Sequence, residues 1–243
     1  MGASGLKESM GDKTSLAEEV YDRLAYDLMT GALPPGTRLK IRDLADKMGV
    51  SVTPIRDAVL RLVNNGGLLF QSPRDIRVPL LERSRYLEIR TIRIELEGLA
   101  AERAAQFADS DDIAYLESIL AENEEAMAAR DHLRALRTNQ KFHLALPEIA
   151  DMATLRSLLE NLWLQMGPLI SSGYDAGGRV MIDHHYTILE AIRMADGAAA
   201  RAAIRNDIMI GGEVLLLRGA LAGELGRGTG LAAAKRPSPL LAK

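Results

Sequence analysis

The hydrophobic positions of the chain follow a helical period over most of its length. Across Thr53–Asn64 the apolar positions recur every three or four residues, at Ile55, Ala58, Val59, Leu62 and Val63. This spacing predicts an amphipathic helix that packs one face and leaves the other, with Arg56 and Arg61, in solvent. Because Pro54 is favoured in the first turn of a helix, we expect Thr53 to be the N-cap.

A shorter helix is expected just before it, from Ile41 to Met48, with Gly49 as its C-cap. A helix, a turn that contains glycine and a second helix with a free polar face form the DNA-binding helix-turn-helix arrangement. Two short β-prone runs follow at 68–70 and 76–78, and the turn residues between them include Arg74. They predict a two-stranded hairpin, the wing of a winged helix, with a plain linker as the alternative.

The residues before this unit predict one further helix and a flexible start. Ser15 and Glu18 have the spacing of a capping box, which predicts that a helix begins there and runs to Gly31. Residues 1–13 are expected to form a disordered arm. We therefore expect a winged helix-turn-helix DNA-binding domain over residues 14–80.

Beyond a hinge at 81–83, the apolar period stays helical to about residue 219. Cap and turn residues divide this part into six predicted helices, at about 84–108, 111–130, 132–146, 151–170, 178–195 and 197–218. Short connections favour antiparallel neighbours, so we expect an antiparallel six-helix bundle over 84–219 for dimerisation and effector binding. Residues 220–243 are expected to form a flexible tail. The predicted fold class is therefore mainly α.

Composition and charge narrow the class of protein. The chain has no cysteine and a formal net charge of −3, and its start lacks the apolar core of a signal peptide. No apolar run is long enough to span a membrane, so we expect a cytoplasmic protein. Arg38–Arg77 contains eight Lys and Arg against four Asp and Glu, whereas 19 basic residues face 23 acidic ones from residue 81 onward. This distribution favours a small DNA-reading head on a neutral-to-acidic body.

The order and spacing of several motifs resemble the GntR family of bacterial transcription regulators. In the head these motifs are LPPGTRL (33–39), DLADKMGVSVTPIRDAV (43–59) and LRLVNNGGL (60–68). The bundle resembles the FadR-type ligand-binding domain of the family, called FCD, nearer its VanR-like branch. The matching motifs there are IRIELEGLAAERAA (92–105), NQKFH (139–143), HYTILEAIRMAD (185–196) and AAARAAIRNDI (198–208). The resemblance implies a homodimer that reads an inverted-repeat operator in double-stranded DNA.

The resemblance also implies which residues of the head contact DNA. Arg42 and Arg56 would contact bases or adjacent phosphates. Ser51 and Thr53 would contact phosphates at the N-terminus of the recognition helix, where the helix dipole favours anions. Arg74 would reach the minor groove or the DNA backbone.

The head departs from the family pattern at two positions. Val52 stands where the family often has a base-reading arginine, and Asp75 stands where its wing usually has glycine. The operator is therefore not expected to have the family's usual sequence, and Arg42 and Arg56 would carry more of the specificity.

Four side chains of the bundle predict a metal site. Asn139 and His143 are four residues apart and share a helix face, while His185 and Asp207 come from the last two helices. If the helices alternate in direction, these groups converge on the bundle axis and can bind one divalent metal ion of the zinc or nickel class. The resemblance implies the same, since many FCD domains bind a metal with one Asp and three His. Here Asn139 replaces the Asp and Asp207 the last His, so hydrogen bonding to a ligand or to one another is the alternative.

Arg93 and Glu97 are also four residues apart, on the first bundle helix. A pair of this spacing is commonly a solvent-exposed ion pair of small energy. The resemblance favours an inward arginine that binds a carboxylate of the effector, with Arg90 as the alternative. The other ligand-binding residues are expected to be Asn139, His143 and His185.

The leading interpretation is a ligand-responsive bacterial transcription regulator, a repressor of a metabolic operon whose effector is a small organic acid. One alternative is a helical metal-dependent hydrolase built on the His/Asp cluster. The sequence shows no evident nucleophile motif or second general base for such an enzyme. A hydrolase also does not explain the helix-turn-helix pattern of residues 37–66. A further alternative is a DNA-binding dimer whose bundle takes no effector. We therefore do not expect an enzyme.

Overall fold

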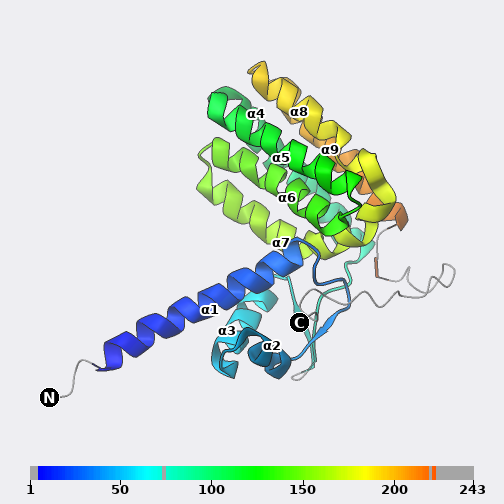
Figure 1. Cartoon of the computed structure of the whole chain (residues 1–243). Coiled ribbons are helices and arrows are strands. Elements are labelled where there is room, and N and C mark those ends of the chain that lie inside the picture. The colour runs from blue at the N-terminus through cyan, green and yellow to red at the C-terminus, as the bar shows by residue number, and fades with distance from the viewer. Residues whose placement is uncertain (1–4, 73–74, 219–220, 223–243) are drawn as a thin grey trace.

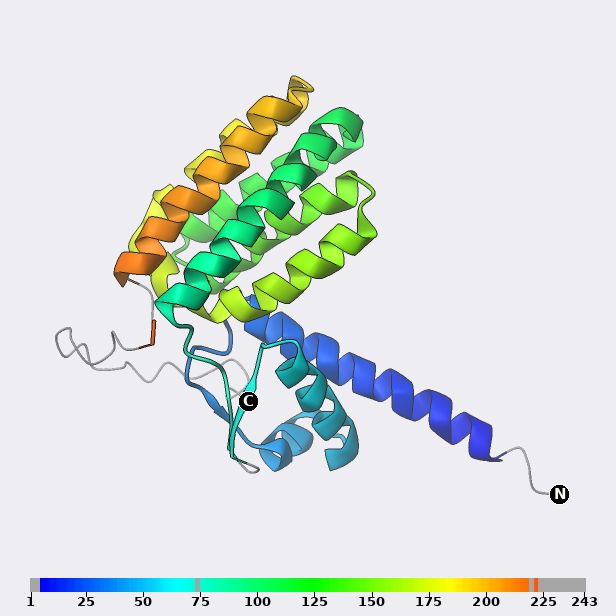
Figure 2. The ribbon, with the colours of Figure 1, turned by 180° about the vertical axis from the view of Figure 1, so that it is seen from behind.

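The computed structural model describes residues 5–72, 75–218 and 221–222. A bundle of long helices stands above a smaller head of helices and short strands (Figure 1, Figure 2). The long helix α1 Gly5–Met29 belongs to the head and meets the base of the bundle at its C-terminal end. The mainly α fold predicted from the apolar period is confirmed.

The head is a winged helix around one apolar core. α1 packs against α3 Val52–Asn64, and α2 Ile41–Met48 ends at Gly49, which has left-handed backbone angles as a C-cap glycine should. The core is filled by side chains of α1, of α3 and of the segment that forms the sheet. They include Leu24, Leu28, Ile55, Leu62, Leu68 and Ile76. The apolar stripe read from the sequence therefore faces the core of the head.

Among the described residues, three short strands form the sheet of the head in the order β1–β3–β2. β2 Leu69–Ser72 and β3 Asp75–Arg77 make the predicted antiparallel hairpin. β1 Arg38–Leu39 pairs with the other edge of β3. The sequence analysis did not predict β1, because a strand of two residues shows no periodicity. This third strand ties the wing to the segment that enters α2.

Two helix starts differ from the prediction. α1 begins at Gly5, so residues 5–13 are helical rather than a disordered arm, and Ser15 lies inside the helix instead of capping it. α3 has Ser51 rather than Thr53 as its N-cap, since Ser51 has extended backbone angles (φ −71°, ψ 164°) and Thr53 is already helical. A capping pattern marks where a helix can begin, and upstream residues can still extend the helix.

Within the described part of the bundle, six α-helices follow one another as predicted. They are α4 Arg83–Phe107, α5 Ser110–Ala128, α6 His132–Ile149, α7 Ala153–Gly177, α8 Asp183–Arg193 and α9 Gly197–Arg218, with a 3-10 turn Gly178–Met181 before α8. α4 and α9 lie side by side along their length (Figure 2). Their small residues, including Ala100 and Ala200, are buried and allow this close packing.

Two predicted helix ends fall later than expected. α6 continues through Pro147 to Ile149, because a proline near a helix end costs few of the helix's hydrogen bonds. α7 continues past Ser171, and the chain turns only at Gly178, whose φ of 52° lies in the left-handed region. α8 also starts later than the predicted residue 178, at Asp183, because a 3-10 turn occupies Gly178–Met181.

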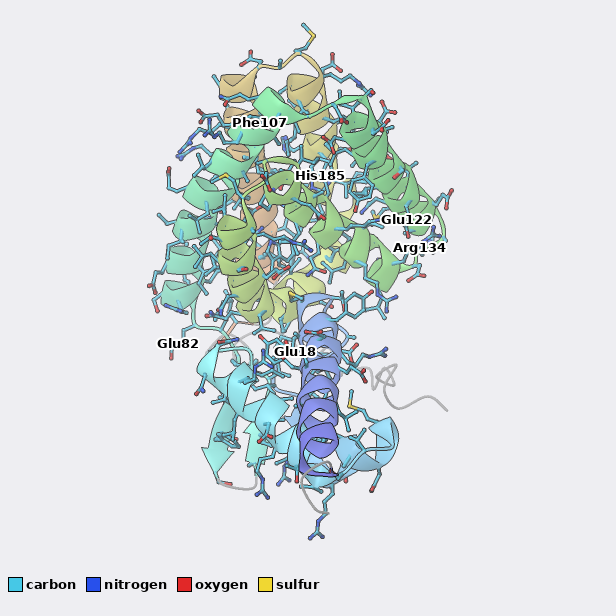
Figure 3. The ribbon with its side chains drawn as sticks, turned by 90° about the vertical axis from the view of Figure 1, so that its left-hand side faces the viewer. Glu18, Glu82, Phe107, Glu122, Arg134 and His185 are labelled. Atoms are coloured by element: carbon cyan, nitrogen blue, oxygen red, sulfur yellow. The ribbon has the colours of Figure 1, made fainter. Side chains whose placement is uncertain are left out.

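The head is docked on α7. Leu164 of α7 is buried in the apolar core of the head. Gly167 permits the approach of α1, since a Cβ at that position would lie 2.4 Å from the carbonyl oxygen of Met29. The hydroxyl of Ser171 donates to the carbonyl oxygen of Gly31 at 3.3 Å. In the side view, α1 enters the base of the bundle directly below α7 (Figure 3).

The predicted hinge at 81–83 leads straight into α4, whose first helical residue is Arg83. The N–H of Ala222 donates to the carbonyl oxygen of Leu81 at 2.9 Å, so the chain beyond α9 returns to this connection. Apart from residues 221–222, the tail predicted at 220–243 lies outside the described residues.

Candidate DNA-reading face and buried polar cluster

The start of α3 and the neighbouring α2 present the side chains that were expected to contact DNA. Arg42, Ser51, Thr53 and Arg56 are all exposed. The hydroxyl of Ser51 does not cap α3, and among the described residues neither arginine forms an ion pair, so these groups can contact phosphates or bases. Arg74 lies outside the described residues.

Arg61 lies on the same polar face of α3 but holds the head together. Its guanidinium donates to both carboxylate oxygens of Glu18 on α1, at 2.6 and 3.2 Å, and lies 4.0 Å from the ring centroid of Tyr21. The side-chain amide of Asn65 donates to the Tyr21 hydroxyl at 2.8 Å. The two arginines that the sequence placed on one face therefore have different partners. Arg56 is exposed to solvent, whereas Arg61 is paired with Glu18 of α1.

The two departures from the family pattern also have visible consequences. Val52, the first residue of α3, is 36% exposed at the N-terminal end of the helix. The Asp75 carboxylate accepts a hydrogen bond from Arg77 Nε at 3.1 Å and pairs with Arg38 Nε at 3.2 Å. Asp75 thus joins β1 to β3 and neutralises part of the charge of the wing.

The other polar site is a buried cluster inside the bundle, at the level where Figure 3 labels His185. His143 of α6 and His185 of α8 face each other, with their Nε2 atoms 3.3 Å apart. The carboxylate of Asp207 on α9 lies 3.3 Å from His143 Nε2 and 3.5 Å from His185 Nε2. One ligand atom from each of these residues lies within 4.8 Å of the others, and all three side chains are buried. The structure therefore brings together three of the four residues expected to hold a metal.

Glu97 connects this cluster to Arg93. The Nε of Arg93 donates to one oxygen of Glu97 at 2.6 Å, and Nδ1 of His143 approaches the other at 2.5 Å. The guanidinium of Arg93 also lies 4.4 Å from the ring centroid of Trp163. The exposed fraction of the Glu97 side chain is 0%, so the alternative of a solvent-exposed ion pair is wrong.

Mutual attraction outweighs desolvation for most groups of the cluster. Burial alone would raise the pKa of Glu97, but Arg93 and His143 more than offset it and the pKa is lowered. Burial lowers the pKa of His143, yet Glu97 and Asp207 outweigh it and raise the pKa to about 9. Burial lowers the pKa of His185 to about 4, against the attraction of Asp207. The two carboxylates therefore favour the charged form of His143, whereas burial favours the neutral form of His185.

A cavity of about 30 Å³ opens beside the cluster. Its polar lining includes Asn139, His143 and Asp207, and its apolar lining comprises Trp163, Met166, Ile170, Met181, Ile208 and Leu215. Arg90 lines the cavity too, and its guanidinium donates to the exposed carboxylate of Glu213 at 3.0 Å. This volume accommodates a metal ion or a few water molecules, whereas an organic acid needs Arg90 or another wall residue to move.

Sequence reasoning found most of this site but not its full charge balance. Asn139 and Arg93 line the cavity, as expected of ligand-binding residues. Glu97 was not expected in the site, although its spacing from Arg93 was the available signal. Trp163 is completely buried and also forms part of the cavity wall.

Comparison with known proteins places the chain in a family. Residues 16–78 match the family described as bacterial regulatory proteins, gntR family, and residues 88–209 match the FCD domain. The chain belongs to the GntR family. Its two matched segments coincide with the head and with the bundle, in the order that the sequence motifs implied.

Individual relatives agree with this membership. The HTH-type transcriptional regulator McbR of Escherichia coli (strain K12) is 32% identical over 77% of this chain and 86% of its own length. The uncharacterized HTH-type transcriptional regulator YdhC of Bacillus subtilis is 30% identical over 75% and 83%. The solved structure of E. coli McbR/YncC superposes with a TM-score of 0.78 at 30% identity, covering 83% of this chain and 97% of that one. A putative GntR regulator from Rhodococcus sp. RHA1 shares the fold, with a TM-score of 0.68 at 18% identity, over 83% of this chain and 98% of that one.

These findings establish the protein as a DNA-binding transcription regulator of the GntR/FCD type and not as an enzyme. The hydrolase alternative is therefore wrong, and the cluster of His143, His185 and Asp207 belongs to a regulatory domain. Among the described helices, none has the length and apolarity needed to cross a membrane.

Proposed function

We propose that this regulator is a cytoplasmic repressor that binds its operator as a homodimer and responds to a small carboxylate bound in the bundle beside a divalent metal ion. The supporting observation is that ionisable side chains from α4, α6 and α9 line one small cavity, and that His185 of α8 belongs to the same buried cluster as His143 and Asp207. Burying such groups is costly, and they cluster in this way mainly at functional sites. No wall of the cavity belongs to the head, so the response must pass through the bundle.

The head supports a dimeric mode of DNA binding. A single winged helix presents one recognition helix, and a two-fold dimer presents two such helices to successive major grooves. The operator is then an inverted repeat. Arg42 and Arg56 would read bases or phosphates in each half-site, and a bidentate arginine–guanine contact contributes ~1–3 kcal/mol of discrimination.

The residues of the cluster fit a divalent cation. His143 and His185 direct Nε2 atoms, and Asp207 a carboxylate oxygen, toward a common point, and Asn139 adds an amide beside them. Glu97 holds Nδ1 of His143, as a carboxylate typically does behind a metal-binding imidazole. When bound, the cation would supply a Lewis-acidic centre that attracts a carboxylate. These donors suit zinc or nickel better than a hard cation such as magnesium.

Two arginines are available to the carboxylate of an effector. Arg93 lines the cavity, but Glu97 already engages its Nε. Arg90 lines the same cavity closer to solvent, and its partner Glu213 is 61% exposed and can release it at little cost. Arg93 would stay paired with Glu97 and contact the effector. Arg90 would move to let the effector enter and would then bind its carboxylate.

DNA binding is tested with operators selected from random duplexes by the wild-type protein. We expect Arg56→Ala to bind the selected operator at least about tenfold more weakly in a gel shift, with the same oligomeric state. Arg205→Ala, an exposed arginine of α9, is the matched control and should bind like the wild type. Unchanged operator affinity of Arg56→Ala would refute the assignment of α3 as the reading helix.

The metal is tested by elemental analysis of the purified protein and of two variants. We expect about one zinc or nickel ion per chain in the wild type, and its loss in His185→Ala. His184→Ala removes the neighbouring imidazole, which is outside the cluster, and should keep the metal. Protein that takes up no metal from a buffered zinc or nickel solution would remove the cation from the proposal.

The effector is tested by thermal unfolding with a panel of small mono- and dicarboxylates. A ligand of the native bundle raises the unfolding temperature by mass action. We expect a shift with at least one acid in the wild type and a smaller shift in Arg90→Ala. No shift with any acid would favour a bundle that serves dimerisation alone.

A further inference from the structure

A second hollow, distinct from the cavity beside His143, lies where the head meets the bundle. Its volume is about 640 Å³, and its walls come from the end of α1 in the head and from α5, α6 and α7 in the bundle. It shares no lining residue with the cavity of the buried cluster. Binding sites for small organic molecules commonly have this size.

Four cations line this junction hollow, and two of them are neutralised by carboxylates. Arg134 of α6 donates to Glu122 at 3.4 Å, a pair that lies on the flank of the bundle in Figure 3. Arg156 of α7 pairs with Glu160 at 3.2 Å. These two arginines therefore contribute little net charge to the hollow.

The other two cations are Arg137 and Lys141, one turn apart on α6. Among the described residues neither forms an ion pair, and each lies over a tyrosine ring. Arg137 is 5.5 Å from the ring centroid of Tyr26 on α1, and Lys141 is 5.2 Å from that of Tyr115 on α5. The two tyrosines are 41% and 39% exposed. The hollow therefore offers two cations that form no ion pair within the described part of the chain, and two accessible aromatic rings.

Arg137 also acts on the head through charge. Asp27 of α1 is only 3% exposed and pairs with Arg23 at 3.5 Å. Burial raises the pKa of Asp27, while Arg23 and Arg137 act in the opposite direction. An anion bound to Arg137 would weaken this attraction between α6 and α1.

We propose that the junction hollow is a second ligand site, which binds a planar aromatic carboxylate through Arg137 and Lys141 beside Tyr26 and Tyr115. Neighbouring cations on one helix face can bind one or two carboxylates with charge-assisted hydrogen bonds. A flat ring also gains stacking contacts with exposed tyrosines, which an aliphatic acid does not. Because Tyr26 belongs to the head and the cations to the bundle, the ligand contacts both parts and biases their arrangement.

Titration calorimetry of the full-length protein with phthalate tests this site, since phthalate carries two carboxylates on a flat ring. We expect saturable binding by the wild type and at least about tenfold weaker binding by the double variant Arg137→Ala/Lys141→Ala. Arg205→Ala removes an exposed arginine that does not line the hollow; it is the matched control and should bind phthalate like the wild type. Cyclohexane-1,2-dicarboxylate, with equal charge and no flat ring, should bind more weakly.

Several results would overturn the proposal. One is the absence of phthalate binding up to about 10 mM, and another is equal affinity in the double variant. Binding that is lost in His185→Ala but kept in the double variant would place the ligand in the bundle cavity instead. If the double variant changes the oligomeric state in sedimentation, the hollow is a contact between two copies of the chain.

Discussion

Glu97 decides how the charges inside the bundle are balanced. It accepts from Arg93 and His143 and has no exposed surface, and its lowered pKa keeps it ionised at neutral pH. Arg93 therefore depends on Glu97, while His143 is shared between Glu97 and Asp207. A buried ion pair adds little stability compared with apolar residues, but removing one partner leaves the other charge without compensation.

We therefore expect Glu97→Gln to lower the free energy of unfolding by ~3–5 kcal/mol in urea titrations. Glu95→Gln is the matched control, since Glu95 is an exposed residue of α4 that pairs with the half-exposed Arg201. It should change stability by less than about 1 kcal/mol. Equal stabilities of the two variants would mean that Glu97 is not ionised in the folded protein.

Asp27 is a buried carboxylate whose environment favours the protonated form. Burial raises its pKa more than Arg23 and Arg137 lower it, so the folded pKa exceeds the unfolded one. A raised pKa gives a contribution to stability that is complete below the unfolded pKa and is lost as pH rises through the folded pKa. The ionised Asp27 therefore destabilises the head–bundle junction at neutral pH.

Asp27→Asn should consequently be at least as stable as the wild type at pH 7, and its relative advantage should shrink toward pH 4. The measurement is urea unfolding at both pH values, with the exposed Asp22→Asn as control. A variant that loses stability at pH 7 would show that the pairing with Arg23 outweighs burial.

At the scale of elements, the docking of α1 on α7 depends on a glycine. A Cβ on Gly167 would lie 2.4 Å from the carbonyl oxygen of Met29 and 2.5 Å from that of Leu28. Both atoms belong to the backbone, so no side chain can move aside. The junction between head and bundle is thus a close packing of two helices, and the apolar pattern of either helix alone does not reveal it.

Gly167→Ala should therefore lower the free energy of unfolding by roughly 1–3 kcal/mol, the usual cost of overpacking. Thermal denaturation of the variant and the wild type measures this difference. Gly211→Ala in α9 is the control, because its Cβ would lie at ordinary contact distances, 3.6 and 3.7 Å, from Cε and Sδ of Met181. Replacing a helical glycine at such a site should stabilise by about 0.5–1 kcal/mol. If Gly167→Ala is as stable as Gly211→Ala, the head does not pack against α7 in this way.

At the scale of the whole molecule, the segment Arg38–Arg77 of the head carries excess positive charge, whereas the chain from residue 81 onward carries excess negative charge. The net charge of −3 would by itself repel DNA, so we expect binding to rely on exposed local cations such as Arg42 and Arg56. A dimer in which each head neutralises two phosphates releases about four counterions.

The affinity of the full-length protein for generic duplex DNA should therefore fall with salt at a log–log slope of about −4. Fluorescence anisotropy over a salt series gives this slope without knowledge of the operator. Arg42→Ala should make the slope shallower by about two in a dimer, whereas Arg205→Ala should leave it unchanged. A slope near zero for the wild type would contradict electrostatic DNA binding by these residues.

The sequence by itself determined the elements and their order. Helical periodicity is local, so α3, the wing and the six bundle helices could be predicted from residues a few positions apart. The placement of Asn139 and His143 on one helix face followed for the same reason. The limits of α1, α6 and α7 were less accurate, because local cap and proline signals do not say how far tertiary packing extends a helix.

The tertiary structure alone decided which distant residues meet. Glu97 and His143 are 46 positions apart, and Arg61 and Glu18 are 43 apart, so no local pattern connects them. The same holds for Leu164, a residue of the bundle helix α7 whose side chain packs in the core of the head. It also holds for the junction hollow, which Tyr26 and Arg137 line together. Local spacing fixes which face of a helix is apolar, but only the packing of complete helices fixes which polar groups are buried together and must balance one another.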